Sequence, residues 1–247
     1  MKQPVALVTG GIGGLGTAIC EELAQQGLRV YANYLPDLEE TAHQWQQTLA
    51  QHNIHCGILK GDVTSEASVA DMVDTLHQKH DSVAVLVNNA GITRDATLKN
   101  LSHQDWYSVI DTNLSSLYRV TKPLLEPMLK VGSGRIINIS SVSAQQGQFG
   151  QTNYAAAKAG VHGFTKALAK EVAAKGITVN TVSPGFVDTE MVKTIPTEVR
   201  TELLSKIPVG RMAQPVEIAK AVAYLASEHA GYVTGSELSI NGGLHMF

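Results

Sequence analysis

Short apolar segments alternate with helix-forming segments along the whole chain, and this alternation is the feature that most restricts the fold. The apolar segments cover residues 5–8, 28–34, 54–62, 83–87, 135–140, 177–182 and 237–240. Helical segments are expected at 15–26, 37–51, 65–80, 102–128, 152–175, 197–206 and 215–227. Apolar residues at consecutive positions are typical of strands buried on both faces, and parallel strands need a crossover such as a helix between them. The pattern predicts an α/β fold: a single doubly wound domain over residues 1–247 with a seven-stranded parallel sheet.

The composition excludes several classes of protein. Hydrophobic residues make up 44% of the chain and charged residues 17%, with a formal net charge of −3, as is usual in globular proteins. No run of basic residues is present to bind nucleic acid, and no apolar stretch approaches the ~20 residues of a membrane span. Residues 1–5 contain no signal sequence, and Cys20 and Cys56 are too few for a disulfide framework. We expect a cytoplasmic protein without nucleic-acid or membrane partners.

The first apolar segment runs into a glycine-rich loop at residues 9–16. Its glycines fit two related patterns: G-x-G-x-x-G at Gly11, Gly13 and Gly16, and T-G-x-x-x-G-x-G at Gly10, Gly14 and Gly16. Glycines at these positions let the backbone approach a pyrophosphate that lies at the N-terminus of the following helix. No Lys-Ser or Lys-Thr pair closes the loop, which excludes a kinase-type phosphate loop. With a strand before it and a helix after it, the loop predicts dinucleotide binding in a Rossmann-type fold.

The residues after the second strand bear on which dinucleotide binds. A 2′-phosphate calls for Arg or Lys near that strand end, whereas a free ribose 2′-hydroxyl calls for a carboxylate. Residues 30–35 offer neither, but Asp37, Glu39 and Glu40 follow. These acids would repel a 2′-phosphate that lies close to them; the alternative is that they form the solvated start of a helix. The charges favour NADH, and NADPH remains open.

Two tyrosine–lysine pairs have the i, i+4 spacing that places both side chains on one helix face: Tyr154 with Lys158, and Tyr118 with Lys122. Tyr154 follows a strand that ends near Ser141, so these polar side chains can meet at the carboxyl edge of the sheet. Tyr118 lies in the middle of a helical segment without such a partner, and we expect it to pack.

Other candidate residues have less specific explanations. His52/His55 and His77/His80 have metal-like spacing without a suggested third ligand, so we expect surface histidines and no metal site. Cys20 and Met128 are expected to be core residues.

Together these motifs resemble those of the short-chain dehydrogenase/reductase family. They occur in the family's order over nearly the whole chain: residues 9–16, Asn88–Gly91, Asn113, Ser141, Tyr154-x-x-x-Lys158 and Pro184–Gly185. Within the family the chain is most similar to the acetoacetyl-CoA reductases of polyhydroxybutyrate synthesis, in the segments Ile92–Asp95, Gly147–Asn153 and Asn241–Met246. The 3-oxoacyl-carrier-protein reductases share the catalytic set.

The resemblance implies an enzyme that reduces a 3-ketoacyl thioester with a nicotinamide cofactor. Tyr154 would donate the proton, and the ammonium of Lys158 would lower the pKa of that phenol and bind the nicotinamide ribose. Ser141 would donate a hydrogen bond to the carbonyl oxygen. Asn113 would hold a water of the proton relay; from the residues alone, a helix-interior amide bonded to its own backbone is the alternative.

The resemblance also implies cofactor and substrate contacts. The cofactor-binding residues would be Gly10, Ile12, Gly13, Gly14, Leu15, Gly16, Tyr34, Asp62, Val63, Asn89, Ala90, Gly91, Tyr154, Lys158, Pro184, Gly185 and Val187. The substrate-binding residues would be Asp95, Gln148, Phe149, Gln151 and Phe186, while Met191 lies in the segment that covers substrates in this family. Turn chemistry at Asp62, loop packing of Phe149 and solvation of the two glutamines are the alternatives.

The substrate and the assembly follow from the same resemblance. Acetoacetyl-CoA is the expected substrate and (R)-3-hydroxybutyryl-CoA the expected product, with a carrier-protein thioester as the alternative. Residues 128–134 contain one lysine, Lys130, where carrier-protein enzymes have more positive charge, although Lys175 could be a second contact. A homotetramer is expected, paired through the long helices after the fourth and fifth strands and through the C-terminal strand. A non-catalytic dinucleotide sensor is the alternative of another class.

Overall fold

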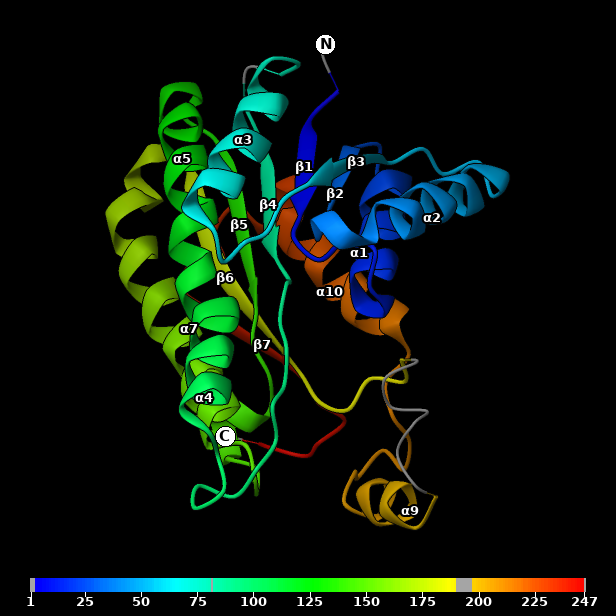
Figure 1. Cartoon of the computed structure of the whole chain (residues 1–247). Helices are drawn as coiled ribbons and strands as arrows, with labels where there is room; N and C mark the ends of the chain where they lie inside the picture. The colour runs from blue at the N-terminus through cyan, green and yellow to red at the C-terminus, as the bar shows by residue number, and fades with distance from the viewer. Residues whose placement is uncertain (1–2, 81, 190–196, 247) are drawn as a thin grey trace.

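Seven parallel strands form one sheet in the computed structural model, which describes residues 3–80, 82–189 and 197–246 (Figure 1). The strands are β1 (Val5–Val8), β2 (Arg29–Tyr34), β3 (Gly57–Lys60), β4 (Val85–Asn88), β5 (Gly134–Ile139), β6 (Ile177–Pro184) and β7 (Glu237–Ile240). Their order is β3-β2-β1-β4-β5-β6-β7, and each neighbouring pair is parallel. The predicted seven-stranded parallel sheet is confirmed. The order reverses between β1 and β4, which is where doubly wound sheets bind their ligands.

Helices cover both faces of the sheet. They are α1 (Gly14–Gln25), η1 (Pro36–Leu38), α2 (Glu39–Gln51), α3 (Glu66–His77), α4 (His103–Ile110), η2 (Asp111–Ser115), α5 (Ser116–Val131), α6 (Ser143–Gln146), α7 (Thr152–Val172), η3 (Ala173–Lys175), α9 (Thr197–Ser205), α10 (Pro215–Ala226) and η4 (Glu228–Ala230). Figure 1 shows α3, α5 and α7 on one side and α1, α2 and α10 on the other, with α9 beyond the carboxyl edge of the sheet.

The two helical layers explain why the strands are apolar at consecutive positions. In β1, Val5 and Leu7 belong to the core beneath α3, α5 and α7, whereas Ala6 and Val8 belong to the core beneath α1 and α10. Each leucine-sized side chain that becomes fully buried contributes ~1.5–3 kcal/mol, so a strand that is apolar on both faces stabilises both layers. Met128 and Cys20 lie in these cores as predicted.

Several predicted boundaries differ from the structure. The third strand is confined to β3, four of the nine predicted residues, because residues 54–56 and 61–62 have no register partner in β2. The helical segment predicted at 102–128 is interrupted by a π-helical turn, η2, and continues to Val131, where Gly132 with a φ of 73° ends it. The short helices α6 and η4 were not predicted, since four or fewer residues carry no periodic signal.

The remaining findings concern histidines, metals and membranes. His77 and His80 are partly buried, and His80 Nε2 shares a 2.8 Å hydrogen bond with the Tyr31 hydroxyl, so the prediction of plain surface histidines is wrong for this pair.

In the part of the chain that the structure describes, no group of three or more His, Cys, Asp or Glu residues is arranged to hold a metal ion. No helix among the described residues is long and apolar enough to span a bilayer. Met191 and Phe247 lie outside the described residues.

Candidate active site

Three of the predicted catalytic residues meet at the carboxyl edge of the sheet. Ser141 follows β5, and Tyr154 and Lys158 occupy consecutive turns of α7. Ser141 shares a hydrogen bond with Tyr154. Lys158 is 3% exposed, its Nζ donates a 2.8 Å hydrogen bond to the carbonyl of Ile139, and it lies 5.8 Å from the centre of the Tyr154 ring. A phenol, a hydroxyl and an amine therefore converge on one point.

Burial shifts the pKa values of both ionisable groups. Burial lowers the pKa of the Lys158 ammonium to about 8, because the charged form loses its hydration. Burial raises the pKa of the Tyr154 phenol, the hydrogen bond with Ser141 lowers it, and the carboxylate of Asp95 raises it again, with a net rise. The ammonium of Lys158 is held by the Ile139 carbonyl in this structure, and its effect on the pKa of the phenol stays a prediction.

Asn113 lies in the π-helical turn between α4 and α5, fully buried. Its Oδ1 accepts from the Ile92 N–H at 2.8 Å and its Nδ2 donates to the Ile92 carbonyl at 2.7 Å. The alternative of an amide bonded to its own helix is wrong. A Cβ at Gly91 would lie 3.0 Å from Asn113 Oδ1 and 3.5 Å from Lys158 Nζ, so Asn113, Gly91 and Lys158 face one small space. π-Helical turns are frequent at functional sites.

The glycine loop has the shape of an anion cradle. Gly10 has a φ of 61°, and a Cβ at Gly16 would collide with the Gly10 carbonyl oxygen, so both positions require glycine. A Cβ at Gly13 would meet only the Gly10 oxygen, at 3.5 Å, which leaves its outer side open. Gly13 caps α1 without a side-chain hydrogen bond, and the first turn of α1 contains no acid. The exposed N–H groups of this helix end fit a pyrophosphate.

A threonine that was not among the predicted site residues joins this loop to the one after β4. The hydroxyl oxygen of Thr9 accepts from the N–H of Asn89 at 2.9 Å and from the N–H of Ala90 at 3.0 Å. The Asn89 amide donates to the Thr9 and Gly10 carbonyls at 2.9 and 3.2 Å. The two sides of the β1/β4 crevice are thus held together. In the sequence, the feature that could have indicated this contact is a threonine at the end of the first apolar segment.

The end of β2 is closed by an asparagine rather than a charged side chain. Asn33 is 2% exposed; its Oδ1 accepts from the Gly10 N–H at 3.2 Å and its Nδ2 donates to the Gly61 carbonyl at 2.7 Å. Tyr34 is buried beside it, and burial and the charge of Glu39 raise the pKa of its phenol, which Lys60 partly offsets. Lys60 Nζ lies 3.3 Å from a Glu39 carboxylate oxygen.

The other predicted cofactor-binding residues also follow strands. The Asp62 carboxylate accepts from the Thr64 N–H at 2.8 Å and its hydroxyl at 2.7 Å, which is the turn chemistry offered as the alternative. Val63 is buried, and Ile12, Leu15 and Val187 pack partly against the core. Pro184 ends β6, and Gly185 lies against Asn241, where a Cβ would come within 2.9 Å of the Asn241 Cα.

The predicted substrate-binding residues fall into three groups. Asp95 accepts a 2.9 Å hydrogen bond from Gln151, whose Oε1 accepts one from Ser143 at 3.0 Å, so these side chains bind each other. Gln148 and Phe149 are exposed, Phe149 to 88%, and the alternative that Phe149 packs in its loop is wrong. Phe186 is partly buried and lines a hollow of about 190 Å³ beside the C-terminal segment.

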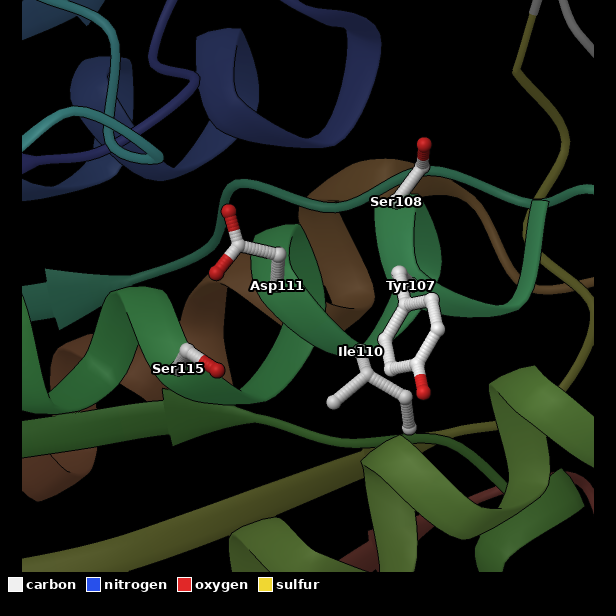
Figure 2. Close-up of a pocket in the computed structure, with 5 residues that line it drawn as sticks. All are labelled: Tyr107, Ser108, Ile110, Asp111 and Ser115. Atoms are coloured by element: carbon white, nitrogen blue, oxygen red, sulfur yellow. The ribbon is translucent and has the colours of Figure 1, made fainter. Parts of the chain in front are cut away.

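A second surface hollow, of about 350 Å³, lies along α4 and η2 (Figure 2). Its lining residues are Tyr107, Ser108, Ile110, Asp111 and Ser115. Asp111 and Ser115 flank Asn113 in the π-helical turn, but none of the predicted catalytic or cofactor-binding residues lines the hollow. The hollow is therefore lined by other residues than those predicted at the strand ends.

The comparisons with known proteins cover nearly the whole chain. A family model described as Enoyl-(Acyl carrier protein) reductase matches residues 10–245. The chain is 50% identical over 242 residues to an acetoacetyl-CoA reductase of Allochromatium vinosum, covering 98% of each chain. It is 49% identical over 246 residues to an acetoacetyl-CoA reductase of Cupriavidus necator, covering 100% of each. It is 47% identical over 246 residues to the 3-oxoacyl-[acyl-carrier-protein] reductase FabG of Pseudomonas aeruginosa, covering 100% of this chain and 99% of the relative. Because these matches include the glycine loop, the strand ends and the tyrosine–lysine helix, the chain belongs to the short-chain dehydrogenase/reductase family.

Proposed function

We propose that this protein is an NAD(P)H-dependent reductase of 3-ketoacyl thioesters. The observation that carries the proposal is the convergence of Ser141, Tyr154 and Lys158 beside the β1/β4 crevice, where the glycine loop presents an uncapped helix end. The open side of Gly13 leaves room for a pyrophosphate to approach the backbone. A dinucleotide bound there would direct its nicotinamide toward the tyrosine, as doubly wound sheets bind ligands across this crevice.

The nicotinamide cofactor, when bound, supplies the hydride. Reduction places negative charge on the carbonyl oxygen, and the Tyr154 phenol donates a proton to it. A phenol is protonated at neutral pH, and the raised pKa of Tyr154 keeps that proton in place until it is donated. Ser141 Oγ accepts from the Ser143 N–H at 3.1 Å, and its hydroxyl hydrogen, which is shared here with Tyr154, would be donated to the developing charge when a substrate oxygen lies beside both side chains. Lys158 lies where it can bind the nicotinamide ribose.

We propose acetoacetyl-CoA as the substrate, reduced to (R)-3-hydroxybutyryl-CoA in the cytoplasm for polyhydroxyalkanoate synthesis. Relatives named acetoacetyl-CoA reductase support this choice, and so does the surface near residues 128–134. The lysine there, Lys130, lies 3.5 Å from Glu126, so its charge is partly neutralised. A 3-oxoacyl-carrier-protein substrate is the second candidate, favoured by the relatives with that name.

The experiment that tests the function measures cofactor oxidation with acetoacetyl-CoA for the wild type and Tyr154→Phe. Turnover by the wild type and its loss in the variant are expected. Equal rates in both would exclude the proposed proton donor, and no turnover in either would favour a dinucleotide sensor. Comparing kcat/KM for acetoacetyl-CoA and acetoacetyl-carrier protein then separates the two thioesters, and a preference for the carrier protein would overturn the CoA assignment.

We propose NADH as the preferred cofactor. Lys60, which is the register partner of Tyr34 at the end of β2, forms an ion pair with Glu39, and the Asn33 side chain is occupied by hydrogen bonds to backbone groups. A 2′-phosphate bound there would meet the carboxylates of Glu39 and Glu40 at the start of α2, while the Lys60 ammonium is already paired with Glu39. A kcat/KM about tenfold better with NADPH, equal to ~1.4 kcal/mol, would contradict this charge argument.

We propose a homotetramer, paired through α5, α7 and β7. Large apolar side chains remain exposed on the described surface, among them Tyr118 at 52%, Tyr232 at 103% and Met246 at 74%. Pairing of subunits through these elements would remove such side chains from water. Sedimentation at micromolar concentration should give four times the 26.4 kDa chain mass, and a monomer would contradict the proposal.

A further inference from the structure

A buried polar network lies behind the proposed catalytic side chains. His162 follows Lys158 by one turn of α7, and its Nε2 lies 2.8 Å from Ser140 Oγ. The Nδ1 atom of the same imidazole lies 3.3 Å from Glu237 Oε2, on β7. Ser140 Oγ donates a 2.9 Å hydrogen bond to the main-chain carbonyl of Lys158. A serine, a histidine and a carboxylate are thus connected in series to the backbone of the catalytic lysine.

The available hydrogens fix the direction of these bonds. The Ser140 hydroxyl gives its one hydrogen to α7, so its oxygen accepts from His162 Nε2–H. Ser183 and Gln145 donate to Glu237 Oε1 at 2.6 and 2.7 Å. With Nε2 protonated, the imidazole meets Glu237 through Nδ1, and one proton lies between that nitrogen and Oε2. Every donor in the network then has an acceptor.

The network is largely, though not fully, buried. The His162 and Glu237 side chains are each 15% exposed, and Ser140 is 3% exposed. The other charge that faces the imidazole is Lys166, one turn further along α7; burial and Lys166 lower the pKa of His162, while Glu237 raises it. Removing one member would leave a buried donor or acceptor of its neighbour unsatisfied.

We propose that His162 and Glu237 are positioning residues that hold the Ser140 hydroxyl on the Lys158 carbonyl. Lys158 is then fixed to β5 at two points, through its carbonyl and through its ammonium on Ile139. These contacts set how α7 faces the end of β5, and so how the catalytic tyrosine and lysine face the catalytic serine. The inference rests on the proposed reductase function and adds residues that touch neither substrate nor cofactor.

The test compares four variants with acetoacetyl-CoA and NADH. His162→Leu and Glu237→Leu should lower kcat about 10- to 100-fold, since small displacements of catalytic groups have effects of this size. Their KM values should change less than about threefold, because neither side chain contributes binding contacts. Glu237→Gln should keep most of the activity, because its amide oxygen can accept from Ser183 and its amide hydrogens can donate to His162 Nδ1.

Thr165→Val is the matched control. Thr165 is on the same helix and 1% exposed, and its hydroxyl bonds to Asn138 at 2.9 Å and Thr181 at 2.8 Å, but not to Ser140. This variant should lose stability and keep its kcat. A His162→Leu enzyme that matches it in both respects would overturn the inference, as would loss of activity in Glu237→Gln.

Two further measurements keep the inference testable. Ser140→Ala should lower kcat as much as His162→Leu, and the double variant should be no worse than either, whereas additive losses would overturn the connection through Ser140. Hydrogen exchange at the backbone of residues 152–162 does not depend on turnover. It should be faster in Glu237→Leu than in Thr165→Val, and equal exchange would count against the positioning role. An inactive wild type would reject the proposed function. The comparison of hydrogen exchange in Glu237→Leu and Thr165→Val would still decide the inference.

Discussion

The two Tyr-x-x-x-Lys pairs have the same spacing and opposite surroundings. Tyr118 is 52% exposed on α5, and its hydroxyl accepts a 2.8 Å hydrogen bond from Lys122 Nζ. In the α7 pair the lysine turns away, and its Nζ donates to the Ile139 carbonyl while lying 5.8 Å from the Tyr154 ring centre. The exposed tyrosine was expected to pack, and that expectation is wrong.

The comparison shows that burial, rather than the bond between the two side chains, prepares a tyrosine and a lysine for chemistry. On α5, both groups are exposed on the surface of the single chain, and the hydrogen bond to Tyr118 is the main cause that raises the pKa of Lys122. On α7, burial lowers the pKa of Lys158 to about 8 and raises that of Tyr154. The second pair therefore has an amine whose pKa lies below its usual value and a phenol whose pKa lies above it, which is the kind of perturbation that clusters at functional sites.

The largest expected difference between the pairs is in turnover. Tyr154→Phe should lower kcat by ~100- to 10,000-fold, because it removes the general acid and leaves the ring in place. Tyr118→Phe should leave kcat unchanged, since it removes an exposed hydroxyl from a helix away from the strand ends. Initial rates of NADH oxidation at saturating acetoacetyl-CoA measure both. A comparable loss in Tyr118→Phe would contradict the assignment of the α7 pair, rather than the α5 pair, as the catalytic one.

The next difference is in stability and its dependence on pH. The folded-state pKa of Lys158 is about 8 and the unfolded value is about 10.5, so the unfolded chain binds more protons between these values and wild-type stability rises with pH. At pH 7 the buried ammonium costs about 3 kcal/mol, which is an order-of-magnitude figure. Lys158→Met should therefore be more stable than the wild type at pH 7, less the lost bond to Ile139.

Urea unfolding at pH 7 and pH 9.5 measures this difference. The advantage of Lys158→Met should shrink as pH rises through 8 toward 10.5, because the wild-type lysine loses its proton in the folded state. Lys122→Met is the matched control, and its unfolding midpoint should differ from the wild type by the same small amount at both pH values. A constant advantage for Lys158→Met would show that its ammonium is better solvated than its burial indicates.

The sheet and the meeting of the catalytic side chains could be predicted because they depend on patterns that one sequence contains. Apolar residues at consecutive positions specify a sheet covered on both faces. Once the strands are parallel, Ser141 and Tyr154 must come out at the same edge as the glycine loop. The i, i+4 spacing then places Lys158 beside the tyrosine.

The features that were missed depend on geometry that a pattern does not encode. A π-helical turn at Asn113 differs from an α-helix by one residue in its hydrogen-bond step, and the surrounding sequence keeps its helical period. Loop side chains such as Asp95 and Gln151 can bind a ligand or each other, and the structure pairs them. The His162–Glu237 contact joins α7 to β7 across 75 positions, which no local spacing reveals.

The smallest expected difference is in how each lysine depends on its tyrosine. Tyr118→Phe removes the acceptor that is the main cause of the raised Lys122 pKa, so that pKa should fall toward its usual value. Tyr154→Phe should leave the pKa of Lys158 low, because burial causes the shift and the phenylalanine ring keeps the site dry. NMR titration of ¹³C-labelled lysine side chains measures both. If the pKa of Lys158 instead returned toward its usual value in Tyr154→Phe, the phenol would have to act on the ammonium directly, and the two pairs would differ in degree and not in kind.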